Sequence, residues 1–136
     1  ERVASPTFAG LRVLLAEDNP VNALLAKTLL RREGCSVETA ASGEEAVASM
    51  ARARYDLVLM DMRMPGMDGL TATRLVREKG DETPIIALTA NAFSEDRRAC
   101  LEAGMNDHLA KPVDVDLLRS ALARWTNRDN RVKLAS

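Results

Sequence analysis

The sequence has few aromatic residues, few cysteines and no excess charge of either sign, and each shortage excludes a class of protein. Phe, Trp and Tyr make up 3% of the 136 residues, so we expect a core of aliphatic side chains. Small disulfide-stabilised domains are far richer in cysteine, and Cys35 and Cys100 do not have the spacing of a metal-binding motif. We therefore expect two reduced thiols.

The balance of charge and the absence of long apolar segments are also informative. Nineteen basic and twenty acidic residues give a formal net charge of -1, so we expect no direct binding to nucleic acid. No apolar segment approaches the ~18–20 residues that cross a bilayer, and the first ten residues lack the basic and apolar regions of a signal peptide. We expect a cytoplasmic domain that makes no membrane contact of its own. The sequence does not indicate an oligomeric state.

The apolar residues gather in five short blocks that predict β-strands. These blocks span residues 11–16, 37–40, 57–60, 85–88 and 108–110. Three of them are nearly continuous apolar runs, which are typical of strands buried on both faces of a parallel sheet.

The segments between the blocks carry helix signals. Asn19 and Pro20 predict a helix start and Gly34 predicts its end, while Ser42 and Glu45 fit a capping box at the start of the next helix. Further helices are expected over about residues 68–80, 94–104 and 114–125. This alternation predicts the α/β class, a doubly wound three-layer sandwich with helices on both faces of a parallel sheet.

One domain accounts for nearly the whole chain. Residues 11–126 are expected to form it, because the apolar periodicity lies within this range. Residues 1–10 lack such periodicity and are expected to be a linker or tail, and residues 127–136 a polar tail.

Polar side chains follow four of the five predicted strands. Glu17 and Asp18 follow the first, Asp61 the third, Thr89 the fourth and Lys111 the fifth. Ligands of open α/β sheets bind outside the carboxyl ends of the strands, so we expect these five side chains to form one site.

The chemistry of this set suits a phosphoryl group. Three neighbouring carboxylates repel one another, and Mg²⁺ would relieve the repulsion while leaving coordination positions for phosphate oxygens. Lys111 supplies a positive charge and Thr89 a hydroxyl donor for the other phosphoryl oxygens. Asp61 is then the candidate nucleophile, because carboxylates can form aspartyl-phosphates.

Four motifs resemble the receiver domain of response regulators in two-component signalling. They are VLLAEDN, LVLMDMRMPGMDG, PIIALTA and HLAKP, in that order along the chain. The resemblance covers about residues 11–125. It implies a flavodoxin-like fold with five helices and a five-stranded parallel sheet in the order 2-1-3-4-5.

The resemblance also implies a role for each acidic residue. Asp61 would be the phosphoacceptor, which takes the phosphoryl group from a phosphohistidine. Glu17 and Asp18 would hold Mg²⁺ together with Asp61 and the backbone carbonyl of Arg63.

Three further positions are implied by the family pattern. Thr89 and Lys111 would contact the phosphoryl group, and a cis peptide bond would precede Pro112. The family couples such a threonine to a switch side chain on the fifth strand, usually Tyr or Phe. His108 stands there instead, so it is either the switch residue or a structural histidine.

The resemblance implies a signalling role with a protein partner. LTANA and AGMNDHLAKP resemble receivers of hybrid histidine kinases, which favours a place in a phosphorelay with a histidine kinase or a histidine phosphotransfer domain as partner. A parent kinase would be the enzyme and the link to a membrane; the receiver catalyses only its own phosphorylation and dephosphorylation.

Three alternatives remain at this point. The chain is a stand-alone response regulator, an interaction module that works without phosphorylation, or a Mg²⁺-dependent phosphatase with an aspartate nucleophile. The phosphatase is disfavoured, because its second aspartate would stand where this sequence has Arg63.

Overall fold

The computed structural model describes residues 8–90 and 94–126, within which strands and helices alternate along the chain. The strands are β1 (Arg12–Ala16), β2 (Ser36–Ala40), β3 (Leu57–Asp61), β4 (Ile85–Thr89) and β5 (Asp107–Ala110). The helices are α1 (Pro20–Arg32), α2 (Gly43–Arg52), α3 (Gly69–Glu78), α4 (Ser94–Ala103) and α5 (Val115–Thr126). All five predicted strands and all five predicted helices are present.

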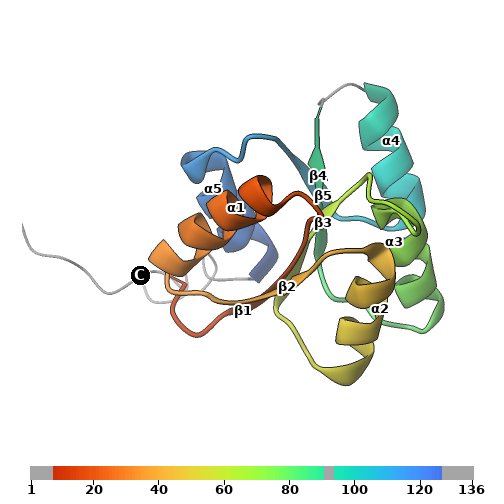
Figure 1. Cartoon of the computed structure of the whole chain (residues 1–136), viewed down its shortest axis with the longest axis horizontal. Helices are drawn as coiled ribbons and strands as arrows, with labels where there is room; N and C mark the ends of the chain where they lie inside the picture. Colours follow the sequence, from red (N-terminus) through yellow and green to blue (C-terminus); the bar gives the residue numbers. More distant parts are fainter. Residues whose placement is uncertain (1–7, 91–93, 127–136) are drawn as a thin grey trace, which may run out of the picture.

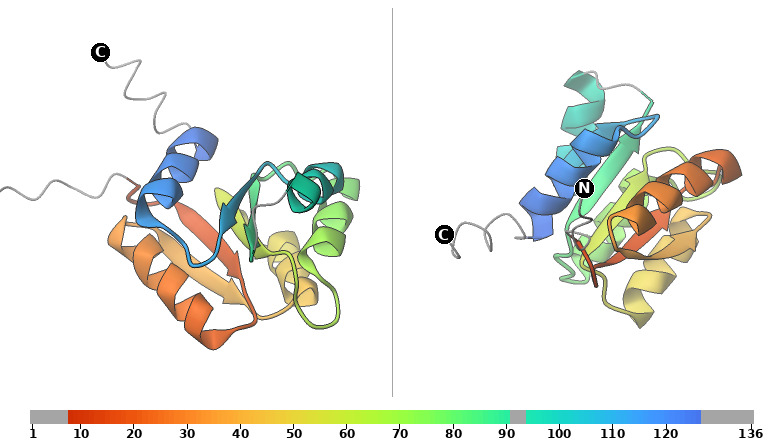
Figure 2. Two further views of the ribbon diagram at one scale, coloured as in Figure 1. Left: turned by 90° about the horizontal axis from the view of Figure 1, so that it is seen from above. Right: turned by 90° about the vertical axis from the view of Figure 1, so that its left-hand side faces the viewer.

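The strands form one parallel sheet in the order β2-β1-β3-β4-β5 (Figure 1). Helices α1 and α5 cover one face, and α2, α3 and α4 cover the other (Figure 2). The predicted fold class and strand order are therefore confirmed. Strand order reverses between β1 and β3, which is where ligands of such sheets bind.

Local hydrogen bonds explain where the first two helices begin. The side chain of Asn19 accepts from the backbone amides of Val21 and Asn22, at 2.9 and 3.1 Å. The Ser42 hydroxyl accepts from the amide of Glu45, as predicted. Each cap stabilises its helix by about 1 kcal/mol and fixes the loop before it. The first of these loops, between β1 and α1, contains the site residues Glu17 and Asp18.

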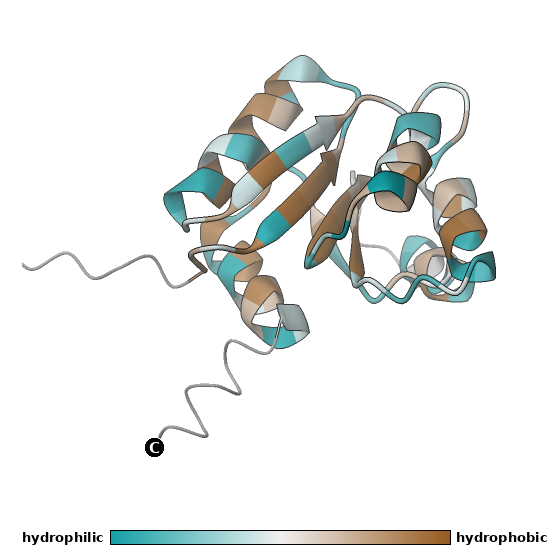
Figure 3. Cartoon of the chain, turned by 90° about the horizontal axis from the view of Figure 1, so that it is seen from below, coloured by the Kyte–Doolittle hydropathy of each residue, from teal (hydrophilic) through white to brown (hydrophobic). Residues whose placement is uncertain are grey.

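The two faces of the sheet are packed with different side chains, although the central strands are apolar along most of their length (Figure 3). The face under α1 and α5 is filled mainly by leucine. The face under α2, α3 and α4 contains the buried methionines, which are Met50, Met60, Met62, Met64 and Met105. Strands β3 and β4 are buried along their whole length. The core therefore holds the backbone of Asp61 and Thr89, the last residues of these two strands.

The packed unit begins earlier than predicted. Phe8 is buried in the core on the side of the sheet that α1 and α5 cover, and its backbone amide donates to the carbonyl of Glu33 at 3.1 Å. The domain thus starts by Phe8 instead of at Leu11, because a single aromatic residue packs without any periodic pattern. Residues 1–7 and the predicted tail over 127–136 lie outside the described residues.

The two cysteines lie in the core of the domain. Cys35 and Cys100 are both buried as thiols, and burial raises the pKa of Cys100. Within residues 8–90 and 94–126, no helix is long and apolar enough to cross a membrane.

Adjacent leucines on α5 test the assignment of the core. Leu118 is fully buried whereas Leu117 is 56% exposed. We expect Leu118→Ala to lower the free energy of unfolding by about 2–5 kcal/mol, because it leaves a cavity. Leu117→Ala should change it by no more than about 0.5 kcal/mol. Urea denaturation measures both, and equal losses would contradict this packing.

Candidate functional site

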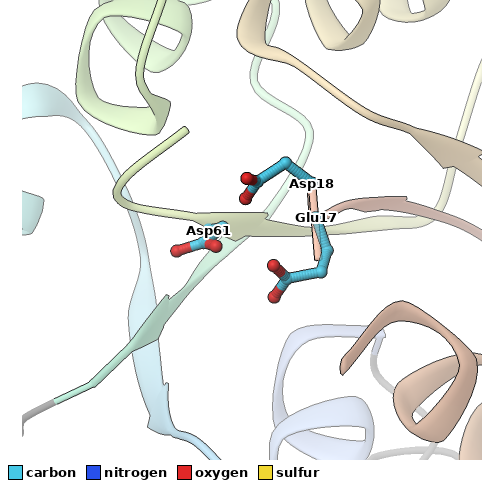
Figure 4. A group of neighbouring side chains, drawn as sticks. All are labelled: Glu17, Asp18 and Asp61. Carbon is cyan, nitrogen blue, oxygen red and sulfur yellow. The ribbon is translucent and has the colours of Figure 1, made fainter. Parts of the chain in front are cut away.

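Three carboxylates meet at the carboxyl edge of the sheet. Glu17 and Asp18 follow β1 directly, and Asp61 is the last residue of β3. One ligand oxygen from each lies within 4.8 Å of the others, and the side chains point toward a common space (Figure 4). Glu17 and Asp61 are buried, whereas Asp18 is exposed to solvent. The site is thus open to ligands on the Asp18 side.

Lys111 brings a positive charge to two of these carboxylates. Its Nζ lies 3.1 Å from Asp61 Oδ2 and 3.5 Å from Glu17 Oε1. The backbone amide of Lys111 donates to the carbonyl of Thr89 at 2.8 Å, so the end of β4 positions the lysine. The peptide bond between Lys111 and Pro112 is cis.

The pKa values of Glu17 and Lys111 are shifted by burial and by the neighbouring charges of the site. Burial raises the pKa of Glu17, and Asp61 raises it further, against the opposing effects of the Asn19 amide and Lys111. Burial lowers the pKa of Lys111, but the hydrogen bond and charge of Asp61 and the charge of Glu17 outweigh it, so the net shift is upward. One ammonium group therefore balances only part of the negative charge.

Thr89 has an unusual hydroxyl. It is the last residue of β4 and is 2% exposed, and its Oγ1 has no hydrogen-bond partner among the described residues. A buried hydroxyl left without a partner costs about 1–3 kcal/mol. Such a group at the edge of an acidic cleft is explained if a ligand supplies the missing acceptor.

The loop after Asp61 returns beside its carboxylate. The backbone amide of Arg63 donates to Asp61 Oδ1 at 3.2 Å. The carbonyl of the same residue is the predicted fourth ligand. Gly69, the first residue of α3, also constrains this loop by its close approach to the backbone of Asp61. A Cβ on residue 69 would lie 2.1 Å from the carbonyl oxygen of Asp61.

His108 lies on β5, where it pairs with Ala87 of β4, two residues before Thr89. Its side chain is 26% exposed, and Nδ1 lies 3.8 Å from Asp107 Oδ1. The other oxygen of Asp107 accepts a hydrogen bond from Trp125 Nε1 on α5, at 2.9 Å. No hydrogen bond joins His108 to Thr89 in the part of the chain that the structure describes. The structure thus brings together the five residues at the strand ends, with His108 at some remove.

The family follows from comparison with known proteins. A model described as the response regulator receiver domain matches residues 13–123. The transcription factor SKN7 of Saccharomyces cerevisiae is 47% identical over 116 residues, which are 85% of this chain and 19% of SKN7. The sensor protein GacS of Pseudomonas syringae pv. syringae is 42% identical over 120 residues, 85% of this chain and 13% of GacS. The chain therefore spans less than a fifth of either relative.

Two solved structures have the same fold. The receiver domain of the sensor histidine kinase PA1611 from Pseudomonas aeruginosa PAO1 has a magnesium ion coordinated in its active site cleft. It is 51% identical, with a TM-score of 0.81, and the match covers 88% of this chain and 99% of that one.

The second structure is the receiver domain of Ssk1 in complex with the histidine phosphotransfer protein Ypd1, from Saccharomyces cerevisiae. It is 29% identical, with a TM-score of 0.79, covering 88% of this chain and 90% of that one. Together with the family match over residues 13–123, these similarities show that the chain belongs to the response regulator receiver domains.

Proposed function

We propose that this receiver accepts a phosphoryl group on Asp61 from a phosphohistidine, in a Mg²⁺-dependent reaction, and transmits the signal within a phosphorelay. The observation that carries the proposal is the group of three carboxylates within 4.8 Å, next to Lys111. The unpartnered hydroxyl of Thr89 supports it, because a phosphoryl oxygen is the acceptor that this hydroxyl lacks.

The residues at the cleft fit a magnesium ion. Oxygen atoms of Glu17, Asp18 and Asp61 form a hard donor set, and one lysine leaves their charge incompletely balanced. We infer that these carboxylates hold Mg²⁺ with the carbonyl of Arg63. When bound, the ion would neutralise charge on the transferred phosphoryl group.

The transfer itself would use the residues already in place. A carboxylate oxygen of Asp61 attacks phosphorus, the new O–P bond forms, and the P–N bond to the donor histidine breaks with its electron pair on nitrogen. Lys111 would exchange its bond to Asp61 Oδ2 for one to a phosphoryl oxygen. Thr89 would donate its hydroxyl to a second oxygen, which would tie the end of β4 to the phosphoryl group.

The partner proposal rests on the surface next to the cleft. Val21 and Leu24 on α1 are 74% and 64% exposed, which is consistent with contact to another protein domain. The complex of Ypd1 with a similar receiver supports a histidine phosphotransfer domain as partner, and a histidine kinase is the other expected donor. The match to sensor kinases favours a receiver fused to a hybrid histidine kinase over a stand-alone regulator.

The signal would leave the site through Thr89 and His108. A bond between Thr89 and the phosphoryl group would shift the end of β4, which pairs with β5 along Ala87 and His108. We therefore propose His108 as the residue that responds in place of the usual aromatic side chain. An interaction module that works without phosphorylation is the second candidate, and labelling distinguishes the two.

Labelling with a small phosphodonor tests Asp61. We expect the intact protein to gain one phosphoryl group from acetyl phosphate with Mg²⁺, and to lose it in hot base. Asp61→Asn should gain none, because its amide is not a nucleophile. Asp116→Asn, which removes an exposed carboxylate on α5, is the matched control and should be labelled like wild type. Full labelling of Asp61→Asn would exclude Asp61 as the acceptor.

A magnesium titration tests the metal ligands. Saturating Mg²⁺ should raise the melting temperature of wild type, since a ligand at 100 times its Kd stabilises the fold by about 2.7 kcal/mol. Asp18→Asn should lose most of this rise, whereas Asp116→Asn should keep it. Differential scanning calorimetry measures these melting temperatures. If Mg²⁺ raised the melting temperature of Asp18→Asn as much as that of wild type, Asp18 would not be a ligand.

The raised pKa of Glu17 predicts a pH dependence in the absence of metal. The folded state binds the proton of Glu17 more tightly than the unfolded state. Its contribution to stability is therefore present below the unfolded value of 4.5 and is lost as pH rises through the higher folded pKa. Glu17→Gln should gain stability relative to wild type over this window, measured by urea denaturation in EDTA. A difference that is constant with pH would contradict this assignment.

A further inference from the structure

The segment between β3 and α3, residues 62–68, is here called the acceptor loop, and glycine backbones hold it at both ends. At its start, the amide of Gly69 donates to the carbonyl of Met62 at 3.0 Å. A Cβ on residue 69 would lie 2.1 Å from the carbonyl oxygen of Asp61, so only glycine allows this approach. This contact comes from the helix that the loop itself leads into.

The other contact comes from a different part of the chain. Gly43 is the first residue of α2, and its amide donates to the carbonyl of Met67 at 3.1 Å. A Cβ on residue 43 would lie 2.4 Å from that oxygen and 2.9 Å from the carbonyl carbon. Real Cβ atoms do not approach other heavy atoms this closely, so any other residue would force the two backbones apart.

The need for glycine at position 43 is one of space. Its backbone is not in the left-handed region, in contrast to Gly66 in the acceptor loop, which has φ +74°. A Cβ at Gly66 would lie 3.2 Å from the carboxylate of Glu44, the residue after Gly43. The start of α2 therefore lies against the acceptor loop over two successive residues.

From this geometry we infer that Gly43 is a positioning residue for phosphoryl transfer. It fixes Met67 and thus the acceptor loop, which in turn sets Arg63 beside the Asp61 carboxylate. The inference rests on the proposed function, in which Asp61 accepts the phosphoryl group and the Arg63 carbonyl binds Mg²⁺. Gly43 touches neither group, and it acts through the backbone of the loop.

The variant Gly43→Ala tests this role against a matched glycine. Gly80 has φ +87°, and a Cβ on residue 80 would meet no atom within 4 Å, so Gly80→Ala strains the backbone without displacing the acceptor loop. Both variants should lose stability. The readouts are the Mg²⁺ affinity, measured by calorimetry, and the rate of labelling by acetyl phosphate. If Gly43 had only a structural role, the two variants would give the same values.

We expect Gly43→Ala to bind Mg²⁺ about tenfold more weakly than wild type and to be labelled correspondingly slowly, the size typical of residues that orient metal ligands. Gly80→Ala should stay within about twofold of wild type. Equal values for the two variants would overturn the inference and leave the proposed function intact. A wild type that binds no Mg²⁺ and takes up no label would overturn both.

A double variant identifies the atoms responsible. Met67→Ala shortens the side chain but leaves the carbonyl that Gly43 approaches. Gly43→Ala combined with Met67→Ala should therefore bind Mg²⁺ as weakly as Gly43→Ala alone. Recovery of wild-type affinity would show that the clash involves the side chain of Met67, and this would overturn a role based on backbone contact.

Amide hydrogen exchange in wild type tests the same coupling if Gly43→Ala does not fold. Coupling is reciprocal, so an ion bound tenfold more tightly because of the Gly43 contact should protect the Gly43 amide by about the same factor. The amide of Ala46, which donates to the carbonyl of Ser42 within the first turn of α2, is the internal control. Equal changes at both amides on Mg²⁺ saturation would overturn the inference.

Discussion

The repulsion among three carboxylates at one sheet edge is the constraint around which this domain is built. Glu17 and Asp61 are held close together because β1 and β3 are adjacent and buried, and Asp18 follows Glu17 directly. Lys111 offsets part of the charge, and it reaches the site only because β5 ends at the same edge. A parallel sheet is the simplest frame that delivers all of these groups to one place, since every strand ends on the same side. The stability of the strands therefore maintains an unfavourable arrangement of charges that a cation would relieve.

Much of this arrangement could be predicted from the sequence, because strong local signals coincide with it. The apolar blocks and the helix caps at Asn19 and Ser42 predicted the alternation of strands and helices. Ligands of open α/β sheets bind outside the carboxyl ends of the strands, and this placed the polar residues that follow the strands in one site. Strand order did not follow from these local signals. It came from the family resemblance, since a periodic pattern does not state which strand pairs with which.

The features that could not be predicted depend on contacts between distant segments. Phe8 is a single core residue in a segment of the sequence without apolar periodicity, so no pattern indicated it. The approach of Gly43 to Met67 is a backbone contact between the first residue of α2 and the acceptor loop. In the sequence, a glycine after a helix cap gives no sign of such a contact. The unpartnered hydroxyl of Thr89 likewise becomes visible only when its neighbours are placed around it.

The hydrogen bond between Trp125 and Asp107 makes the intrinsic fluorescence of the domain sensitive to the position of β5. Trp125 is the single tryptophan of the chain, and its indole donates to a carboxylate directly before His108. Indole emission depends on hydrogen bonding and on nearby charge, so a displacement of β5 against α5 changes the fluorescence of this one residue. Tryptophan fluorescence can thus follow a movement of the edge strand β5 in the unlabelled protein, in real time and without a partner present.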